Sequence, residues 1–382
     1  MAAPIIIIGS GLAGFNTIKE FRRHDTTTPV VMLTADDGQN YSKPMLSTGF
    51  TRNKAADELV MATVDKLKEQ FDVDLRTHTV VTGIDVDAKQ VSLDNGDTLA
   101  YSKLVLANGA KVFEPPLKGS GLDAVYTVNN LMDYRRFREA LEGKKRVVIV
   151  GSGLIGTEFS NDLTNGDFQV HVVEPAGRCL PTFLPEEASL AVSGALSELG
   201  VTFHFGPFAQ EVEKLDHGVR VHLSDGATID ADVVLSAVGL QPNIDLAKAA
   251  GLEVNRGVKV DKFLRASHPD VFALGDCAEV EGHVLLYVLP LMAAARALAS
   301  TLAGTETAVK YPAMPITIKV PACAVACAPP PLGLEGRWEV EQDGHHVKAL
   351  YYDTQDQLRG FALTGDAVKE RMALGKQLPD LF

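Results

Sequence analysis

The stretch that decides the fold is IIIIGSGLAG, residues 5–14. Four consecutive β-branched residues, 5–8, predict a strand that is buried on both faces, as in a parallel sheet. A helix-periodic segment follows over Leu12 to Arg23, and a second apolar run over Val30 to Leu33 predicts the next strand. The N-terminal region therefore begins as a strand–turn–helix–strand unit of an α/β protein.

The turn of this unit carries three glycines in the spacing G-x-G-x-x-G. In a strand-to-helix turn, Gly9 permits the tight bend and Gly11 lets a pyrophosphate approach the backbone. Gly14 lets the helix lie close to the sheet, and the helix N-terminus faces the negative charge of the phosphates. The spacing and its context predict a dinucleotide-binding loop.

The same unit occurs a second time. A strand is predicted over Arg146 to Val150, a helix over Leu154 to Leu163 and a second strand over Val170 to Val173. The turn between the first strand and the helix reads GSGLIG, residues 151–156. Its three glycines are Gly151, Gly153 and Gly156. Two correctly placed copies predict two Rossmann-like dinucleotide-binding domains.

The second strands of the two units end differently. Glu174 closes the second one, where a carboxylate can accept hydrogen bonds from an adenosine ribose and repel a 2′-phosphate. This favours NADH over NADPH, although Arg178 lies near enough to leave the preference open. In the first unit Thr34 holds the corresponding place, and Asp36 and Asp37 follow just beyond it.

Composition limits the partners. Lys and Arg number 36 against 49 Asp and Glu, so the net charge is 36 − 49 = −13, which argues against nucleic acid and anionic membranes. The N-terminal apolar run lacks a basic flank and a cleavage site, and no stretch is long enough to span a bilayer. Four scattered cysteines form no disulfide framework. We therefore expect a cytoplasmic protein without nucleic-acid binding, membrane insertion or a metal site.

The last part of the chain differs in character. The change falls near Pro312, and the chain is rich in proline from Met314 onward. Alternating segments at 336–340, 347–352 and 358–363 predict an antiparallel sheet. A terminal helix is predicted over Asp366 to Lys376. We expect a third, small α+β domain.

Four further motifs carry a resemblance to a known family. They are VFALGD at 271–276, AVGLQPN at 237–243, LANG at 106–109 and YSKPMLS at 41–47. Taken in their order along the chain, these motifs resemble the FAD-dependent pyridine nucleotide-disulfide oxidoreductase superfamily. Together with MPITIK at 314–319 and the prolines after it, the segment at 41–47 is most similar to the ferredoxin- and rubredoxin-reductase branch.

The resemblance implies a split arrangement of domains. FAD would be bound by residues 1–112 and 245–312, NADH by residues 113–244, and residues 313–382 would form the C-terminal domain.

The resemblance also implies site residues. Those expected at FAD are Gly9, Gly11, Leu12, Ala13, Gly14, Thr34, Lys43, Val81, Glu158, Asp276, Val288 and Lys319. Those expected at the nicotinamide dinucleotide are Gly151, Gly153, Leu154, Ile155, Gly156, Glu174 and Gly239. Lys43 and Glu158 would form an ion pair near flavin N5, while Lys319 and a helix begun by Pro290 would face the N1 side. Taken singly, Asp276 also fits a helix cap, Lys319 a solvated strand residue and Glu158 a helix-surface acid.

The implied activity is electron transfer from NADH through FAD to rubredoxin, with the electrons serving alkane hydroxylation or oxygen reduction. Region 41–50 contains no cysteine, and Cys323 with Cys327 matches no dithiol relay, so electrons would leave the flavin directly. The alternatives are a reductase of a [2Fe–2S] ferredoxin or another oxygenase-coupled iron protein, and a redox-responsive protein that holds FAD and NADH but turns over slowly.

Overall fold

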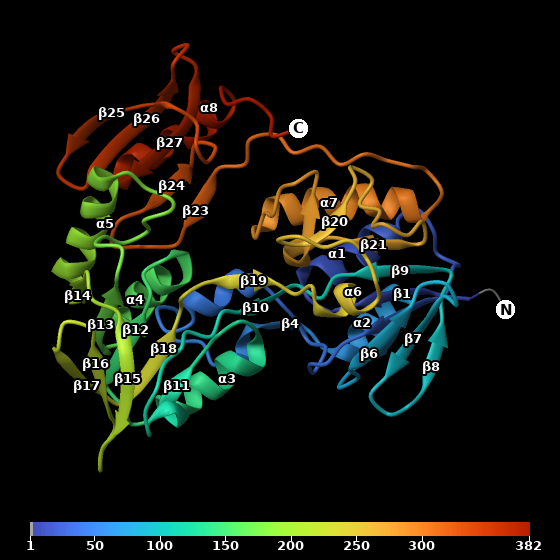
Figure 1. The fold of residues 1–382 in the computed structure, drawn as a ribbon, viewed down its shortest axis with the longest axis horizontal. Helices are drawn as coiled ribbons and strands as arrows, with labels where there is room; N and C mark the ends of the chain where they lie inside the picture. Colours follow the sequence, from blue (N-terminus) through green and yellow to red (C-terminus); the bar gives the residue numbers. More distant parts are fainter. Residues whose placement is uncertain (1–2) are drawn as a thin grey trace.

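The computed structural model describes residues 3–382 and divides them among three groups of elements (Figure 1). The first is a parallel sheet in the order β21-β9-β1-β2-β5. Its strands are β1 (Ile5–Ile8), β2 (Val30–Leu33), β5 (Asp74–Arg76), β9 (Lys103–Leu106) and β21 (Val271–Ala273). Because β21 pairs in parallel with β9, the chain leaves this sheet near residue 106 and completes it some 160 positions later.

Helices and small sheets surround this first sheet. Helix α1 (Leu12–Phe21) packs against α7 (Val288–Leu302), which again joins early and late parts of the chain. The remaining elements of this group are β3 (Asn40–Tyr41), η1 (Lys43–Thr48), η2 (Ala56–Leu59), β4 (Val60–Ala62), α2 (Val64–Phe71), β6 (Val81–Asp85), β7 (Gln90–Leu93), β8 (Thr98–Ala100), α6 (Asp245–Ala249), β20 (Val258–Val260), η4 (Gly275–Cys277) and β22 (Ala278–Val280).

The second group repeats the first. Its parallel sheet has the order β11-β18-β12-β13-β14, so the strand before the glycine turn is again central and the next two strands follow on the same side. The strands are β11 (Val125–Tyr126), β12 (Arg146–Val150), β13 (Gln169–Glu174), β14 (Thr202–Phe205) and β18 (Val233–Ser236). Helices α3 (Leu131–Ala140), α4 (Leu154–Asn165) and α5 (Glu186–Leu199), the short η3 (Leu122–Ala124) and the antiparallel strands β15 (Ala209–Lys214), β16 (Val219–Leu223) and β17 (Thr228–Ala231) complete it.

A two-stranded ribbon joins the two groups. Strand β10 (Ala110–Val112) leads out of the first sheet and β19 (Leu240–Pro242) leads back from the second. They pair antiparallel, with Lys111 opposite Gln241. Both crossings of the chain therefore lie side by side, at the edge where the two glycine loops are found.

The third group is an antiparallel sheet in the order β23-β24-β27-β26-β25. Its strands are β23 (Ile316–Ile318), β24 (Val325–Ala328), β25 (Gly336–Asp343), β26 (His346–Asp353) and β27 (Leu358–Thr364). The sheet packs against α5, and its buried side chains share one core with those of the second group. These three groups confirm the predicted fold class: two Rossmann-like α/β units with a small C-terminal unit.

The terminal helix predicted over 366–376 is present, but in two pieces rather than as one regular α-helix. The segment divides into a tight 3₁₀ turn, η5 (Gly365–Glu370), and a short helix α8 (Arg371–Gly375). The first turn is tied to the sheet because the backbone N–H of Asp366 donates to His346 Nδ1 at 2.9 Å. This contact orders the segment as a turn on the sheet rather than as one regular helix.

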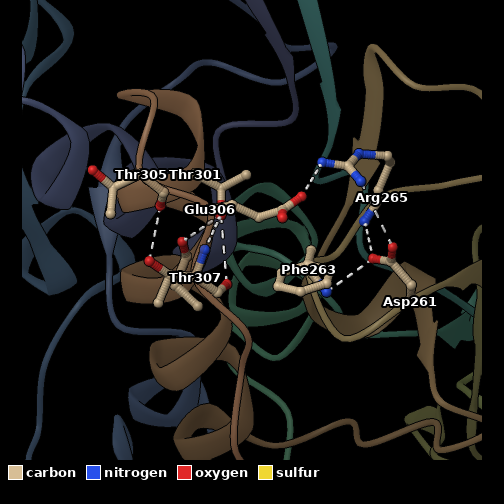
Figure 2. Close-up of polar contacts among 8 residues, drawn as sticks. Asp261, Phe263, Arg265, Thr301, Thr305, Glu306 and Thr307 are labelled. Carbon is tan, nitrogen blue, oxygen red and sulfur yellow. Dashed lines mark hydrogen bonds and ion pairs between the residues drawn. The ribbon is translucent and has the colours of Figure 1, made fainter.

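The linker from α7 to β23 is fixed where it begins (Figure 2). Glu306 accepts a hydrogen bond from Arg265 Nη2 at 2.7 Å, and the N–H of Thr307 donates to Thr301 Oγ1 at 3.0 Å. Asp261 in turn accepts from the N–H of Arg265 at 2.9 Å. Hydrogen bonds to the end of α7 and to the 261–265 turn therefore fix the start of the linker in place.

Within residues 3–382 no helix combines the length and the apolar character that crossing a membrane requires.

Candidate functional site

The first glycine loop is closely packed behind and open in front. Gly9 has a φ of +111°, and a Cβ there would lie 2.3 Å from the carbonyl oxygen of Ala107. A Cβ on Gly14 would lie 2.0 Å from the carbonyl oxygen of Gly9, so helix and strand can approach only without side chains. A Cβ on Gly11 would meet no atom within 4 Å. Two of the glycines therefore serve packing, whereas Gly11 faces open space.

A carboxylate just beyond the end of the second strand anchors this loop. The side chain of Asp36 accepts hydrogen bonds from Ser10 Oγ at 3.0 Å, from Thr34 Oγ1 at 2.7 Å and from the N–H of Gly38 at 2.9 Å. Thr34 follows the end of β2 as predicted, but the acid that reaches the loop lies two residues further on. Sequence reasoning noted Asp36 without assigning it, and the Ser10 hydroxyl in the loop was the available signal.

The second glycine loop repeats this design with its acid in the expected place. Glu174 is buried at the end of β13, and one carboxylate oxygen accepts from the N–H of Ser152 at 2.8 Å. The other oxygen accepts from the N–H of Ala176 at 2.8 Å. A Cβ on Gly156 would lie 2.0 Å from the carbonyl oxygen of Gly151, the first glycine of this loop. A Cβ on Gly153 would meet no atom within 4 Å, so Gly153 faces open space.

A cavity of about 420 Å³ lies in front of the first loop. The residues predicted at FAD that line it are Gly11, Leu12, Ala13, Lys43, Glu158, Asp276, Val288 and Lys319. Gly9, Gly14, Thr34 and Val81 are not among its lining residues. Gly9 and Gly14 lie on the closely packed side of the loop, away from the cavity. Thr34 donates a hydrogen bond to Asp36, and Val81 belongs to β6.

A second cavity of about 1290 Å³ lies in front of the second loop. All but Gly156 of the residues predicted at the nicotinamide dinucleotide line it. The two cavities adjoin, because they share five lining residues. These are Leu154, Ile155, Leu240, Leu286 and Tyr287.

The predicted ion pair between Lys43 and Glu158 is wrong, because each of these residues pairs with a different partner. Lys43 Nζ donates to Asn129 Oδ1 at 2.7 Å and lies 3.9 Å from Asp276 Oδ2. Burial lowers the pKa of Lys43, and the nearby Asp276 opposes that shift. Burial likewise raises the pKa of Asp276, against the attraction of Lys43. Asn129, which sequence reasoning missed, follows β11 and carries no local motif.

Glu158 is held by other groups. Its side chain is buried and forms an ion pair with the ammonium group of Lys319. The carboxylate also accepts from the backbone N–H of Lys319 at 2.9 Å and from Ser47 Oγ at 2.5 Å. The reading of Glu158 as a helix-surface acid is therefore wrong, and the cation paired with its carboxylate is Lys319 rather than Lys43.

Helix α7 presents its first turn to the first cavity. It begins at Val288, two residues before Pro290, and both residues line the cavity. The unpaired N–H groups of a helix N-terminus favour negative charge in front of them. The prediction of a helix near Pro290 is confirmed, with a slightly earlier start.

The four cysteines are packed in the core. All four are free and buried, and none lines either cavity. Burial raises the pKa of Cys327 to about 12 and also raises the pKa of Cys323. Packed thiols of this kind are poor nucleophiles and poor redox partners.

Comparison with known proteins agrees with this geometry. Residues 3–300 match the family model described as pyridine nucleotide-disulphide oxidoreductase, and residues 308–378 match the model described as rubredoxin binding C-terminal domain. The chain therefore belongs to the pyridine nucleotide-disulphide oxidoreductase family, and it is an oxidoreductase that uses FAD with NADH as substrate.

Individual relatives narrow the branch. A rubredoxin-NAD(+) reductase of Alcanivorax borkumensis is 60% identical over 99% of this chain and 99% of its own length. A rubredoxin-NAD(+) reductase of Acinetobacter baylyi is 44% identical over 99% of this chain and 98% of its own. A solved ferredoxin reductase of the CYP199A2 system from Rhodopseudomonas palustris superposes with a TM-score of 0.88 at 26% identity, covering 98% of this chain and 95% of that one. The resemblance stated from the motifs is confirmed.

Proposed function

We propose that this protein oxidises NADH and delivers single electrons to a rubredoxin, with FAD in the first cavity and the nicotinamide dinucleotide in the second. The observation that carries the proposal is the shared wall of the two cavities. Hydride transfer needs the reacting atoms about 3–3.5 Å apart, which adjoining cavities permit without a relay. Bound FAD would supply the redox chemistry, because a flavin can accept a hydride from NADH and release the electrons one at a time to an iron centre.

The first cavity suits a flavin dinucleotide. Gly11 leaves room where a side chain would fill the cradle, and the N-terminus of α1 favours the negative charge of a pyrophosphate. We assign FAD binding to residues 1–112 and 245–312, NADH binding to 113–244 and acceptor binding to 313–382.

Charged residues of the first cavity would tune the flavin. Lys43 and Lys319 both line it, and the N-terminus of α7 adds partial positive charge. Positive charge beside the ring favours its reduced, anionic form and so raises its potential. Glu158 fixes the ammonium group of Lys319, and Asn129 with Asp276 fixes that of Lys43. The lysines orient and stabilise; no acid, base or nucleophile is required.

The C-terminal match favours rubredoxin as acceptor over a [2Fe–2S] ferredoxin, because residues 308–378 resemble a domain described as rubredoxin binding. We also assign the protein to the cytoplasm. Four free cysteines fit a reducing compartment, where thiols are kept unpaired.

A matched pair of substitutions tests the assignment of the cavities. Gly11→Val and Gly153→Val each add a side chain at a position where a Cβ meets no protein atom within 4 Å, so both variants should fold. We expect Gly11→Val to be purified with little FAD. Gly153→Val should keep its FAD but lose affinity for NADH. Full FAD content in Gly11→Val, or FAD loss in Gly153→Val, would overturn the assignment.

A further inference from the structure

A segment of the FAD-binding part reaches into the NADH-binding part. Phe50, just after η1, places its ring 5.3 Å from that of Phe168, 6.1 Å from that of Tyr134 and 6.4 Å from that of Phe137, all with edge-on geometry. Arg138 lies over the same ring, with Cζ 4.3 Å from the centroid. Such aromatic and cation–π contacts fix the orientation of a ring.

The backbone of this segment is held as firmly as its side chain. Asp162, on α4, accepts hydrogen bonds from the N–H of Phe50 at 3.1 Å and of Thr51 at 2.7 Å. Gly49 passes so close to Tyr134 that a Cβ would lie 2.1 Å from the phenol oxygen. A carboxylate that is 2% exposed and bonds two backbone groups from a distant segment has a specific partner rather than solvent.

The same face of α4 also holds the C-terminal unit. Asn161 Oδ1 accepts from the N–H of Ala322 at 2.9 Å, and Glu158 binds the backbone and side chain of Lys319. Residues 158, 161 and 162 share a helix face because they are separated by three and four positions. The first turn of α4 lines both cavities through Leu154 and Ile155.

We propose that Asp162 is a positioning residue: it locks the Phe50 segment to α4 and thereby sets the distance between the bound nicotinamide and the flavin. The inference rests on the proposed function. Segment 43–47 lines the flavin cavity immediately before the locked residues, so a change in the lock displaces that segment relative to α4. Hydride transfer is sensitive to such displacement, since a shift of about 1 Å can cost up to about a hundredfold in rate.

The experiment uses the FAD-loaded protein and follows flavin reduction by NADH in rapid mixing. We expect the limiting rate at saturating NADH to fall about tenfold in Asp162→Ala and less in Asp162→Asn, which keeps one acceptor oxygen. Phe50→Leu should lower the same rate through the ring contacts. The apparent dissociation constant for NADH, the FAD content and reoxidation of dithionite-reduced enzyme by a chemical oxidant should all stay within about twofold. Glu142→Gln, at an exposed acid of the same part of the chain, is the control and should leave every value unchanged.

A normal limiting rate in Asp162→Ala would overturn the proposal. So would a loss shared equally by both half-reactions or explained by lost FAD, because that result indicates general destabilisation. If Asp162→Ala does not fold, normal rates in both Asp162→Asn and Phe50→Leu would overturn it instead. Reduction of the unmodified protein by NADH tests the proposed function separately.

Discussion

The buried carboxylate of Glu158 lies between the ammonium group and the backbone N–H of Lys319, a residue 161 positions further along the chain. This ion pair joins α4 to the C-terminal unit beside the flavin cavity. A buried carboxylate that loses its cation is strongly destabilising, whereas removing both charges together is often tolerated.

Lys319→Met should therefore lower the free energy of unfolding by about 3 kcal/mol, because Glu158 would stay buried without a cation. The double variant Glu158→Gln/Lys319→Met should recover most of that loss. Urea unfolding followed by circular dichroism measures both. If the double variant is no more stable than Lys319→Met alone, the pair is not coupled as the geometry indicates.

The cysteines should be unreactive towards thiol reagents in the folded protein. Burial raises the pKa of Cys327 to about 12 and that of Cys179 to about 11, so their thiolates are scarce at pH 8. A thiol reagent should label none of the four cysteines at pH 8 until a denaturant is added. Cys323→Ala/Cys327→Ala should retain NADH-to-acceptor turnover within about twofold. A loss of several powers of ten with FAD still bound would reveal a redox pair.

The preference for NADH should depend on the charge of Glu174. Glu174→Gln removes the repulsion of a 2′-phosphate but keeps one acceptor oxygen, which can still bond to the loop N–H of Ser152. We expect the ratio of kcat/KM for NADPH to that for NADH to rise about tenfold, roughly 1.4 kcal/mol. Glu211→Gln, at an exposed acid of the same cavity, should leave the ratio unchanged. Equal kcat/KM values for NADH and NADPH in the unmodified protein would show that Glu174 does not select NADH.

The KM for rubredoxin should not rise with ionic strength. The chain carries a net charge of −13, so an acidic acceptor would be repelled at long range. Raising the ionic strength screens this repulsion, and the KM for rubredoxin should stay constant or fall modestly at saturating NADH. A small neutral acceptor should show no trend. A steep rise of the rubredoxin KM with salt would instead show that pairing of opposite charges dominates docking.

The parts of the molecule that follow local rules could be predicted from the sequence. Both glycine loops, their flanking strands and Glu174 depend on short-range geometry, because a tight turn and a close helix-to-strand approach admit only glycine. The antiparallel strands of the C-terminal unit were recognisable by their alternation.

Side-chain pairing across the units could not be predicted. Lys43 contacts Asn129 and Asp276 rather than Glu158, whose carboxylate accepts instead from Ser47 and from the backbone and side chain of Lys319. Asp162 gave no signal at all, since a lone acid on a helix is ordinarily solvated and its partners are backbone N–H groups over a hundred positions earlier. Such contacts depend on how the units pack, and spacing along the chain does not encode it.

Anaerobic reduction followed by titration with rubredoxin tests the central claim most directly. The FAD-loaded protein is mixed with one equivalent of NADH, and oxidised rubredoxin is then added while the flavin absorbance is recorded. The proposed function predicts that NADH bleaches the flavin completely and that two equivalents of rubredoxin restore it, since a hydride carries two electrons and a single-iron protein accepts one. Flavin that NADH does not bleach, or that a [2Fe–2S] ferredoxin reoxidises while rubredoxin does not, would contradict it.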